Sequence, residues 1–188
     1  KGHSANIHEW VPEVSGRLAG QIDTRFELKD KQWSLMLPRI DVNGQLNGYP
    51  LSLTGNIKGN DKLQWQVSNL LVRSGNNQLS INGSLGTRWQ LDGALNAPEL
   101  GIFYPELSGD VVSTFSLAGS ATAPQFSWNL EANKLNLATM AFRDIHSKGV
   151  VKRGKLWSGD GQILVGRIRN PSLRLENASV KFDGDEHN

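Results

Sequence analysis

The chain contains no cysteine, which excludes disulfide bonds, thiol catalysis and the usual cysteine-based zinc sites. It also has no run of about 18 apolar residues, the length that a membrane-spanning helix needs. The first ten residues, KGHSANIHEW, hold no signal-peptide core. If the protein belongs to a cell envelope, we therefore expect its targeting or anchoring segment to lie outside this sequence.

Neither sign of charge dominates, because 20 Lys and Arg stand against 18 Asp and Glu, for a net charge of +2. A chain with so small a net charge has no overall field to hold a polyanion, so no nucleic acid is expected as a partner. Histidine is scarce and scattered, and no two of the four share a strand at ligand spacing, so no metal site or cofactor is predicted. Neither a nucleophile-elbow motif nor a phosphate-binding loop is present, and the chain is not expected to be an enzyme.

Apolar residues recur at every second position along most of the chain. Between Arg17 and Lys29 one parity carries Leu18, Gly20, Ile22, Thr24, Phe26 and Leu28, whereas the other is almost entirely charged or amide-bearing. This period of two is typical of a β-strand with one wet and one dry face. The pattern predicts many such strands.

The strand-like runs are separated by glycine-containing turn signals, among the 20 glycines of the chain. Asn-Gly and similar pairs supply the positive φ angles of tight hairpins. Turn signals of this kind occur at Asn43-Gly44, Asn47-Gly48, 59–61, 74–77, Ser108-Gly109, Gly149 and 159–161. Only the segment from Ala97 to Pro105 could form a helix, and its prolines would keep that helix short. We predict an all-β fold and one domain over residues 1–188, a long antiparallel meander whose residues 1–9 and 183–188 are frayed.

A degenerate repeat reads apolar, polar, apolar, any, Gly at four places, beginning at Leu51, Leu79, Trp89 and Phe115. In each copy the glycine shares parity with the apolar residues, which predicts sharp bends of the sheet at Gly55, Gly83, Gly93 and Gly119. A meander with one apolar face has to close into a barrel, stack on a second sheet or fold along its length. The pattern fits a sheet curled into a taco-like, hydrophobically lined groove, and an ordinary sandwich stays open as the alternative.

If such a groove exists, residues of the apolar parity line it. Trp33, Trp65, Trp89 and Trp128 share that parity, so their rings either pack in a core or line the groove. The candidate lining residues are Leu51, Leu53, Leu63, Trp65, Val67, Leu79, Ile81, Leu85, Trp89, Leu91, Leu95, Phe115, Leu117, Phe126, Trp128, Leu130, Leu135 and Leu137.

A run of basic residues follows in the last third of the chain: Lys148, Lys152, Arg153, Lys155, Arg167 and Arg169. Because these charges are spaced and interrupted by valines, they fit a solvated outer face. They could also meet phospholipid headgroups at the mouth of a groove.

Several segments, taken in order, resemble the middle, periplasmic part of the AsmA-like TamB family of Gram-negative envelope proteins. They are WVPEVSGRLAG (Trp10 to Gly20), LSLTGNIKGN (Leu51 to Asn60), SGNNQLSINGSLG (Ser74 to Gly86), LDGALNAPEL (Leu91 to Leu100) and LSGDVVSTFSLAGSATAPQ (Leu107 to Gln125). The likeness covers more than three quarters of the chain and fades beyond Pro171.

The resemblance implies a section of a long periplasmic bridge, anchored in the inner membrane and meeting TamA at the outer membrane. It implies a hydrophobic conduit that carries phospholipids by their acyl chains between the two membranes. An alternative role of the same family is a chaperone-like module that captures β-strands of outer-membrane proteins during assembly. For these functions the resemblance places the protein in the periplasm.

Overall fold

The computed structural model describes residues 2–6 and 16–185 of the chain, and nearly all of them lie in β-strands. The strands are β1 (Gly2–Asn6), β2 (Gly16–Lys29), β3 (Gln32–Leu46), β4 (Tyr49–Asn60), β5 (Trp65–Ser74), β6 (Asn77–Leu85), β7 (Arg88–Ala97), β8 (Leu107–Gly109), β9 (Val111–Ser120), β10 (Ala123–Leu137), β11 (Met140–Arg153), β12 (Trp157–Arg169) and β13 (Arg174–Asp185). One 3-10 turn, η2 (Leu100–Ile102), lies within the segment predicted to form a short helix. Of the termini predicted to be frayed, residues 1, 7–9 and 186–188 lie outside the described part.

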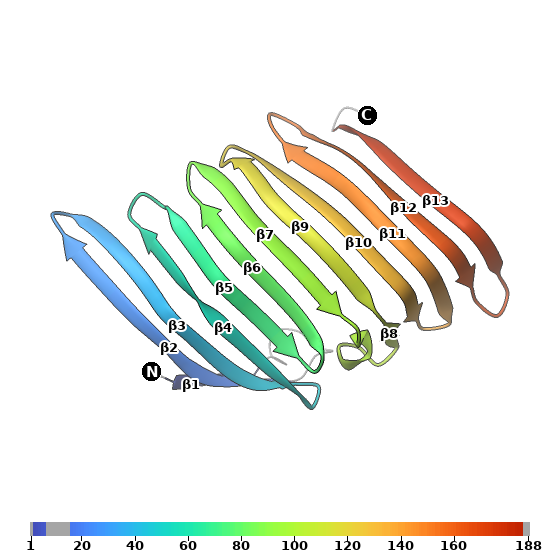
Figure 1. Cartoon of the computed structure of the whole chain (residues 1–188), viewed down its shortest axis with the longest axis horizontal. Helices are drawn as coiled ribbons and strands as arrows, with labels where there is room; N and C mark the ends of the chain where they lie inside the picture. The colour runs from blue at the N-terminus through green and yellow to red at the C-terminus, as the bar shows by residue number, and fades with distance from the viewer. Residues whose placement is uncertain (1, 7–15, 186–188) are drawn as a thin grey trace.

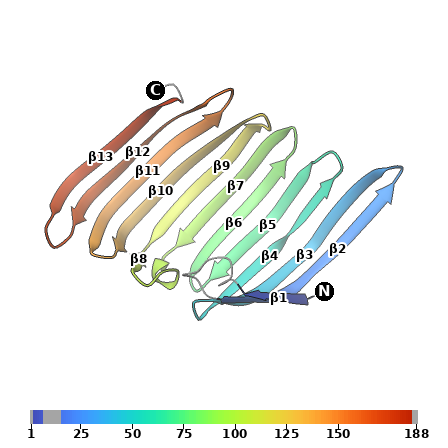
Figure 2. The same ribbon diagram turned by 180° about the vertical axis from the view of Figure 1, so that it is seen from behind.

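The thirteen strands form one sheet in which every described pair is antiparallel. Strand order follows the sequence from β1 to β13, with one exception. The short β8 pairs with residues 135–137 of β10, whereas β9 pairs with residues 123–131 of the same strand. Figures 1 and 2 show the strands side by side in a single layer, with β2 toward one end and β13 at the other. The predicted all-β antiparallel meander is therefore confirmed.

The sheet stays open, and the tight taco-like curl expected from the glycine pattern is not a pronounced feature of it (Figure 1). The repeat glycines instead produce local effects. Gly55 and Gly83 adopt φ angles of 149° and 142°, a region that residues with a Cβ rarely enter. Both lie beside shifts of strand register, next to Asn56 in the β4–β5 pair and opposite Val67 in the β5–β6 pair.

Only some of the predicted turns are turns. Asn47 and Gly48 have φ angles of 50° and 83° and connect β3 to β4, as a tight hairpin requires. By contrast, Gly44 lies inside β3, Gly149 inside β11 and residues 159–161 inside β12. The turn prediction was wrong at these places, and at Gly149 and Gly161 the missing side chain makes room for an aromatic ring, as described below.

In β10 to β13 the apolar residues recur at every second position except at one place in each strand, where they are three positions apart. The strand register aligns these four places side by side. Apolar pairs flank this place in every strand: Ala132 and Leu135, Ile145 and Phe142, Val165 and Ile168, Ala178 and Leu175. Asp144 and Asn177 there have φ angles of 54°, and the Asp110 carboxylate accepts hydrogen bonds from the backbone N–H groups of Asn133 and Lys134 at 3.1 Å. These irregularities keep the apolar residues on one face although the sequence loses its period of two.

Little of the chain is buried. The accessible surface is 12450 Å², whereas a compact monomer of 20.7 kDa exposes about 8,900 Å². Among the described residues the buried hydrophobic side chains are Ile40, Ala97, Ile102, Ala132 and Ile145. The excess surface follows from the architecture, because a single-layer sheet has no second layer to cover its apolar side.

The connection between β7 and β8 is where an irregular segment packs against strand ends. Its Ile102 is 5% exposed, and the Asn47 side-chain amide donates to the carbonyl oxygens of Ile102 and Phe103 at 2.9 and 3.0 Å. The Asn77 side chain bonds to both backbone groups of Glu99, donating to its oxygen at 2.8 Å and accepting from its N–H at 2.9 Å. Two asparagines at the ends of strands thus fasten this connection to the sheet.

Asn77→Ala should lower the free energy of unfolding by about 1–3 kcal/mol, because Asn77 is 4% exposed and its loss leaves two backbone groups of Glu99 without partners. Asn76→Ala is the matched control, since Asn76 donates to the Glu99 carboxylate at an exposed site. Urea denaturation followed by tryptophan fluorescence measures both. Equal midpoints for the two variants would contradict a fastening role for Asn77.

Candidate functional site

One face of the sheet carries unbroken cross-strand rows of uncharged, mainly apolar residues. The register aligns four such rows: Leu35, Gly59, Trp65, Leu85, Trp89, Gly119 and Pro124; Leu37, Ile57, Val67, Gly83, Leu91, Leu117, Phe126 and Val151; Leu70, Ile81, Gly93, Phe115, Trp128, Gly149, Gly161 and Phe182; Val42, Leu53, Val72, Leu79, Leu95, Ser113, Leu130, Ser147, Ile163 and Val180. We call the face that bears these rows the apolar face. It contains no charged residue in these rows and runs across the strands from β3 to β13.

Most of the predicted lining residues meet in these rows. The exceptions lie at strand ends: Leu51 pairs with Gly44 and Ser74, while Leu135 and Leu137 pair with β8 and with the start of β11. Leu63 lies outside the strands, in the β4–β5 connection, with a φ of 56° and 66% exposure. The register thus joins residues from ten strands, β3 to β7 and β9 to β13, into one surface.

Aromatic rings on the apolar face lie over glycines of the adjacent strand. A Cβ added to Gly59, Gly93, Gly149 or Gly161 would come within 2.4 Å of a ring atom of Trp65, Phe115, Trp128 or Phe182, respectively. Each ring therefore occupies the space that a side chain on the neighbouring strand would need. This arrangement covers the exposed glycine backbone with apolar area.

Glycine also lets rings from distant strands meet. Trp128 in β10 and Phe182 in β13 stack with centroids 6.2 Å apart and planes at 13°, although two strands separate them. The intervening residues at this level are Gly149 and Gly161, so both rings can lean across the gap. A second stack, of Phe126 on Trp128 at 6.0 Å, continues the aromatic surface.

Sequence reasoning missed several members of the apolar face as site residues. Leu35, Leu37, Ile57, Val72 and Val151 follow the same alternation as the predicted lining residues, so the parity signal could have found them. Phe182 alternates with Val180 in the same way, but the sequence does not show which residue its ring contacts. Its place depends on the stack with Trp128, which becomes visible only through the register of three strand pairs.

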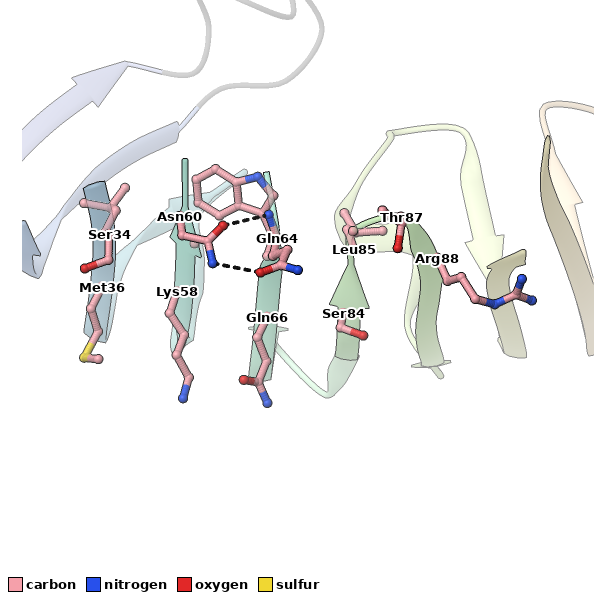
Figure 3. A pocket seen from close by; sticks show the side chains of 14 residues that line it. Ser34, Met36, Lys58, Asn60, Gln64, Gln66, Ser84, Leu85, Thr87 and Arg88 are labelled. Atoms are coloured by element: carbon pink, nitrogen blue, oxygen red, sulfur yellow. Dashed lines mark hydrogen bonds between the residues drawn. The ribbon is translucent and has the colours of Figure 1, made fainter. Parts of the chain in front are cut away.

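The opposite face is polar, and a hollow lies on it at the β4–β5 and β6–β7 connections. The hollow measures about 610 Å³ and is bordered by Met36, Lys58, Gln66, Ser84 and Arg88, among others. Figure 3 shows Met36, Lys58 and Gln66 extending to the same side of the sheet. Its residues include no nucleophile beside a base, so the hollow offers amide, hydroxyl and cationic groups but no catalytic arrangement.

The Asn60 side chain forms hydrogen bonds within the β4–β5 connection, beside this hollow. Its oxygen accepts a hydrogen bond from the Lys62 backbone N–H at 3.0 Å. Figure 3 shows its two bonds to Gln64, whose backbone N–H donates to the Asn60 oxygen at 3.3 Å and whose side-chain oxygen accepts from the Asn60 amide at 3.0 Å. These contacts order a turn. The hollow's shape is thus a consequence of local turn geometry.

The fold and the apolar face define a class of protein: an open, single-layer antiparallel sheet that leaves a continuous apolar surface uncovered. A family model described as "TamB, N-terminal domain" matches residues 3–188. The chain belongs to this TamB N-terminal domain family. The expectation of a middle segment is not supported, because the matching model describes the N-terminal domain, and the match also includes the residues beyond Pro171 where the resemblance seen in sequence faded.

Two relatives agree with this assignment. The chain is 27% identical over 184 residues to a Haemophilus influenzae protein named translocation and assembly module subunit TamB, covering 97% of this chain and 14% of that protein. It is 25% identical over 173 residues to an uncharacterized protein of Buchnera aphidicola, covering 91% of this chain and 18% of that protein. The chain therefore spans less than a fifth of the length of either relative. No solved structure matches it.

No helix in residues 2–6 and 16–185 is long and apolar enough to cross a membrane. Within the same residues, no group of three or more metal-ligating side chains comes together. The apolar face is thus the feature of this structure that calls for a function.

Gly93→Ala should lower the free energy of unfolding by about 1–3 kcal/mol, because the new methyl group has to displace the Phe115 ring. Gly86→Ala is the control, since its Cβ would make only ordinary contacts, at 3.6 Å or more, and should change stability by less than about 0.5 kcal/mol. Urea denaturation measures both values. If the two variants unfold at the same urea concentration, the ring does not depend on the glycine.

Proposed function

We propose that the apolar face carries phospholipid acyl chains and that this chain is a section of a hydrophobic conduit between the inner and outer membranes. The observation that carries the proposal is the set of unbroken, charge-free rows crossing the sheet. Each methylene group sheltered from water contributes about 0.8 kcal/mol. An acyl chain can therefore bind here without any polar contact.

The direction of the rows suits movement as well as binding. They run perpendicular to the strands, with one step of about 4.8 Å per strand, so the row from Val42 in β3 to Val180 in β13 crosses ten strands and spans about 43 Å. Most steps along the rows present Leu, Ile, Val or aromatic side chains, and the other steps present mainly glycine or serine. A lipid tail on such a surface meets nearly equal binding energy at each step, which allows it to slide.

Membership of the TamB N-terminal domain family supports the cellular setting of this proposal. The Haemophilus relative is named as a subunit of a translocation and assembly module. We accordingly place the protein in the periplasm of a Gram-negative envelope, within a longer protein anchored in the inner membrane and paired with TamA at the outer membrane. The function is transport without chemical change of the lipid, and no catalytic step is proposed.

A second function, capture of outer-membrane protein strands, is favoured by the edge of the sheet. A strand at the edge of a sheet presents a row of backbone donors and acceptors, and β13, which pairs with β12, is the last strand of the part that the structure describes. An extended peptide could add to such an edge by backbone hydrogen bonding. This function depends on edge backbone atoms, whereas lipid carriage depends on side chains of the apolar face.

Leu91→Asp should abolish lipid binding, because it places a charge in the middle of a row between Gly83 and Leu117. The measurement is native mass spectrometry with lipid extraction on the protein purified from a bacterial envelope. We expect phospholipid to co-purify with the wild type and to fall at least tenfold in the variant. Thr114→Asp, on the polar parity of the neighbouring strand β9, is the matched control and should retain lipid.

Circular dichroism shows whether Leu91→Asp is folded, and Leu91→Asn serves as an uncharged second variant. Lipid retained by folded Leu91→Asp, or a wild type free of lipid, would refute the conduit. A wild type that instead carries peptide, lost when β13 is altered and kept in Leu91→Asp, would favour strand capture.

A further inference from the structure

The structure divides the basic residues of the last third of the chain between two ends of the strands. Lys152, Arg153 and Lys155 lie at the β11–β12 connection, where the Arg153 guanidinium sits 5.0 Å from the Trp157 ring centroid. Arg167 and Arg169 lie at the other end of β12. There the register brings them beside cations from three other strands.

At that end, residues of like charge stand directly opposite one another. Lys134 of β10 pairs with Arg143 of β11, and Arg143 pairs with Arg167 of β12. One step further along, Arg169 pairs with Arg174 of β13. Like charges in directly opposed positions destabilise a sheet, so folding alone does not account for this arrangement. We call these five residues the basic rim.

In the part of the chain that the structure describes, no acidic side chain forms an ion pair with the basic rim, although the Asp110 carboxylate accepts a hydrogen bond from the Lys134 backbone N–H. Glu176 stands opposite Arg167, and Asp144 lies next to Arg143 in the chain. The ion pairs found in the described residues are Arg39 with Asp41 and His146 with Glu131, neither of them in the rim. Arg143 instead donates to the Asn136 side chain and to the Phe142 carbonyl oxygen, both at 2.8 Å. Its positive charge is thereby held in place without being cancelled.

The same end of the strands exposes apolar side chains. Leu137, beside the β10–β11 connection, is 53% exposed, and Leu173 and Leu175, at the start of β13, are 42% and 45% exposed. Leu137 and Leu175 belong to the apolar parity of their strands, whereas the rim cations belong to the polar parity. The connections between strands bring both sets to one edge of the sheet.

We propose that the basic rim and its three leucines dock this end of the sheet on an anionic membrane surface. Cations near an anionic bilayer interact with lipid phosphates, and neighbouring apolar side chains enter the boundary between headgroups and acyl chains. A soluble polyanion would satisfy the cations but would leave the leucines in water. The conjunction of both kinds of side chain therefore favours a bilayer.

Docking of the rim does not depend on the conduit. It concerns strand ends at β10 to β13, whereas lipid carriage concerns the rows across the sheet. Loss of one function without the other distinguishes them, because Leu91→Asp leaves the rim intact and rim variants leave the rows intact.

The test is co-sedimentation of the protein with vesicles of phosphatidylglycerol and phosphatidylcholine, compared with vesicles of phosphatidylcholine alone. The triple variant Arg167→Gln, Arg169→Gln, Arg174→Gln should bind the anionic vesicles at least tenfold more weakly, because each cation near such a surface strengthens binding about fivefold. The control Lys58→Gln, Lys62→Gln, Arg88→Gln removes the same charge at exposed positions near the opposite ends of their strands and should change binding less than about twofold. Leu173→Ser should also weaken vesicle binding.

Equal binding to neutral vesicles, or an equal loss in the control variant, would overturn the proposal. A short polyphosphate that binds the wild type as tightly as anionic vesicles, with no effect of Leu173→Ser, would assign the rim to a soluble polyanion instead. The urea midpoint of the triple variant should stay equal or rise, because opposed like charges have been removed. A fall in that midpoint together with unchanged vesicle binding would show a purely structural role.

Discussion

Backbone hydrogen bonding between successive strands is the interaction on which this structure depends. Elsewhere a sheet gains much of its stability by burying one face against a second layer, but here the twelve strands of the main order lie in one layer. Each strand is therefore held chiefly by its two neighbours. Cross-strand contacts between side chains provide what burial otherwise supplies, and the unit resembles a repeat array in which each element touches only those next to it.

The pairing of aromatic residues with glycines follows from this constraint. With no opposing layer, a ring can gain contact only by lying flat along the sheet, and it needs a neighbour without a side chain to do so. Phe115 over Gly93 and Trp128 over Gly149 show the arrangement. It provides local stability and leaves one surface of each ring uncovered, so the same side chains would serve both folding and the proposed binding of acyl chains.

An uncovered apolar face and a basic rim with exposed leucines place two surfaces of different chemistry on one sheet, and we propose a different lipid contact for each. The first is free of charge and continuous, which suits acyl chains in motion. The second is concentrated at strand ends, where the connections between strands bring the two faces together, which suits attachment to a surface. Both surfaces arise from the alternation of apolar and polar residues along the strands. The apolar face is formed by the middle of the strands, and the basic rim with its leucines is formed by their ends.

The sequence by itself determined the fold class and most of the apolar face, because a period of two assigns each residue of a strand to a face whatever the strand's neighbours are. Leu91 and Leu117 could be placed in this way. Only the tertiary structure decided which glycines lie in turns and which lie under an aromatic ring of the next strand. It also decided that the sheet stays open and that Lys134, Arg143 and Arg167 lie side by side on neighbouring strands. These features depend on strand register, which is set by bulges and by contacts between residues distant in sequence, and alternation carries no information about it.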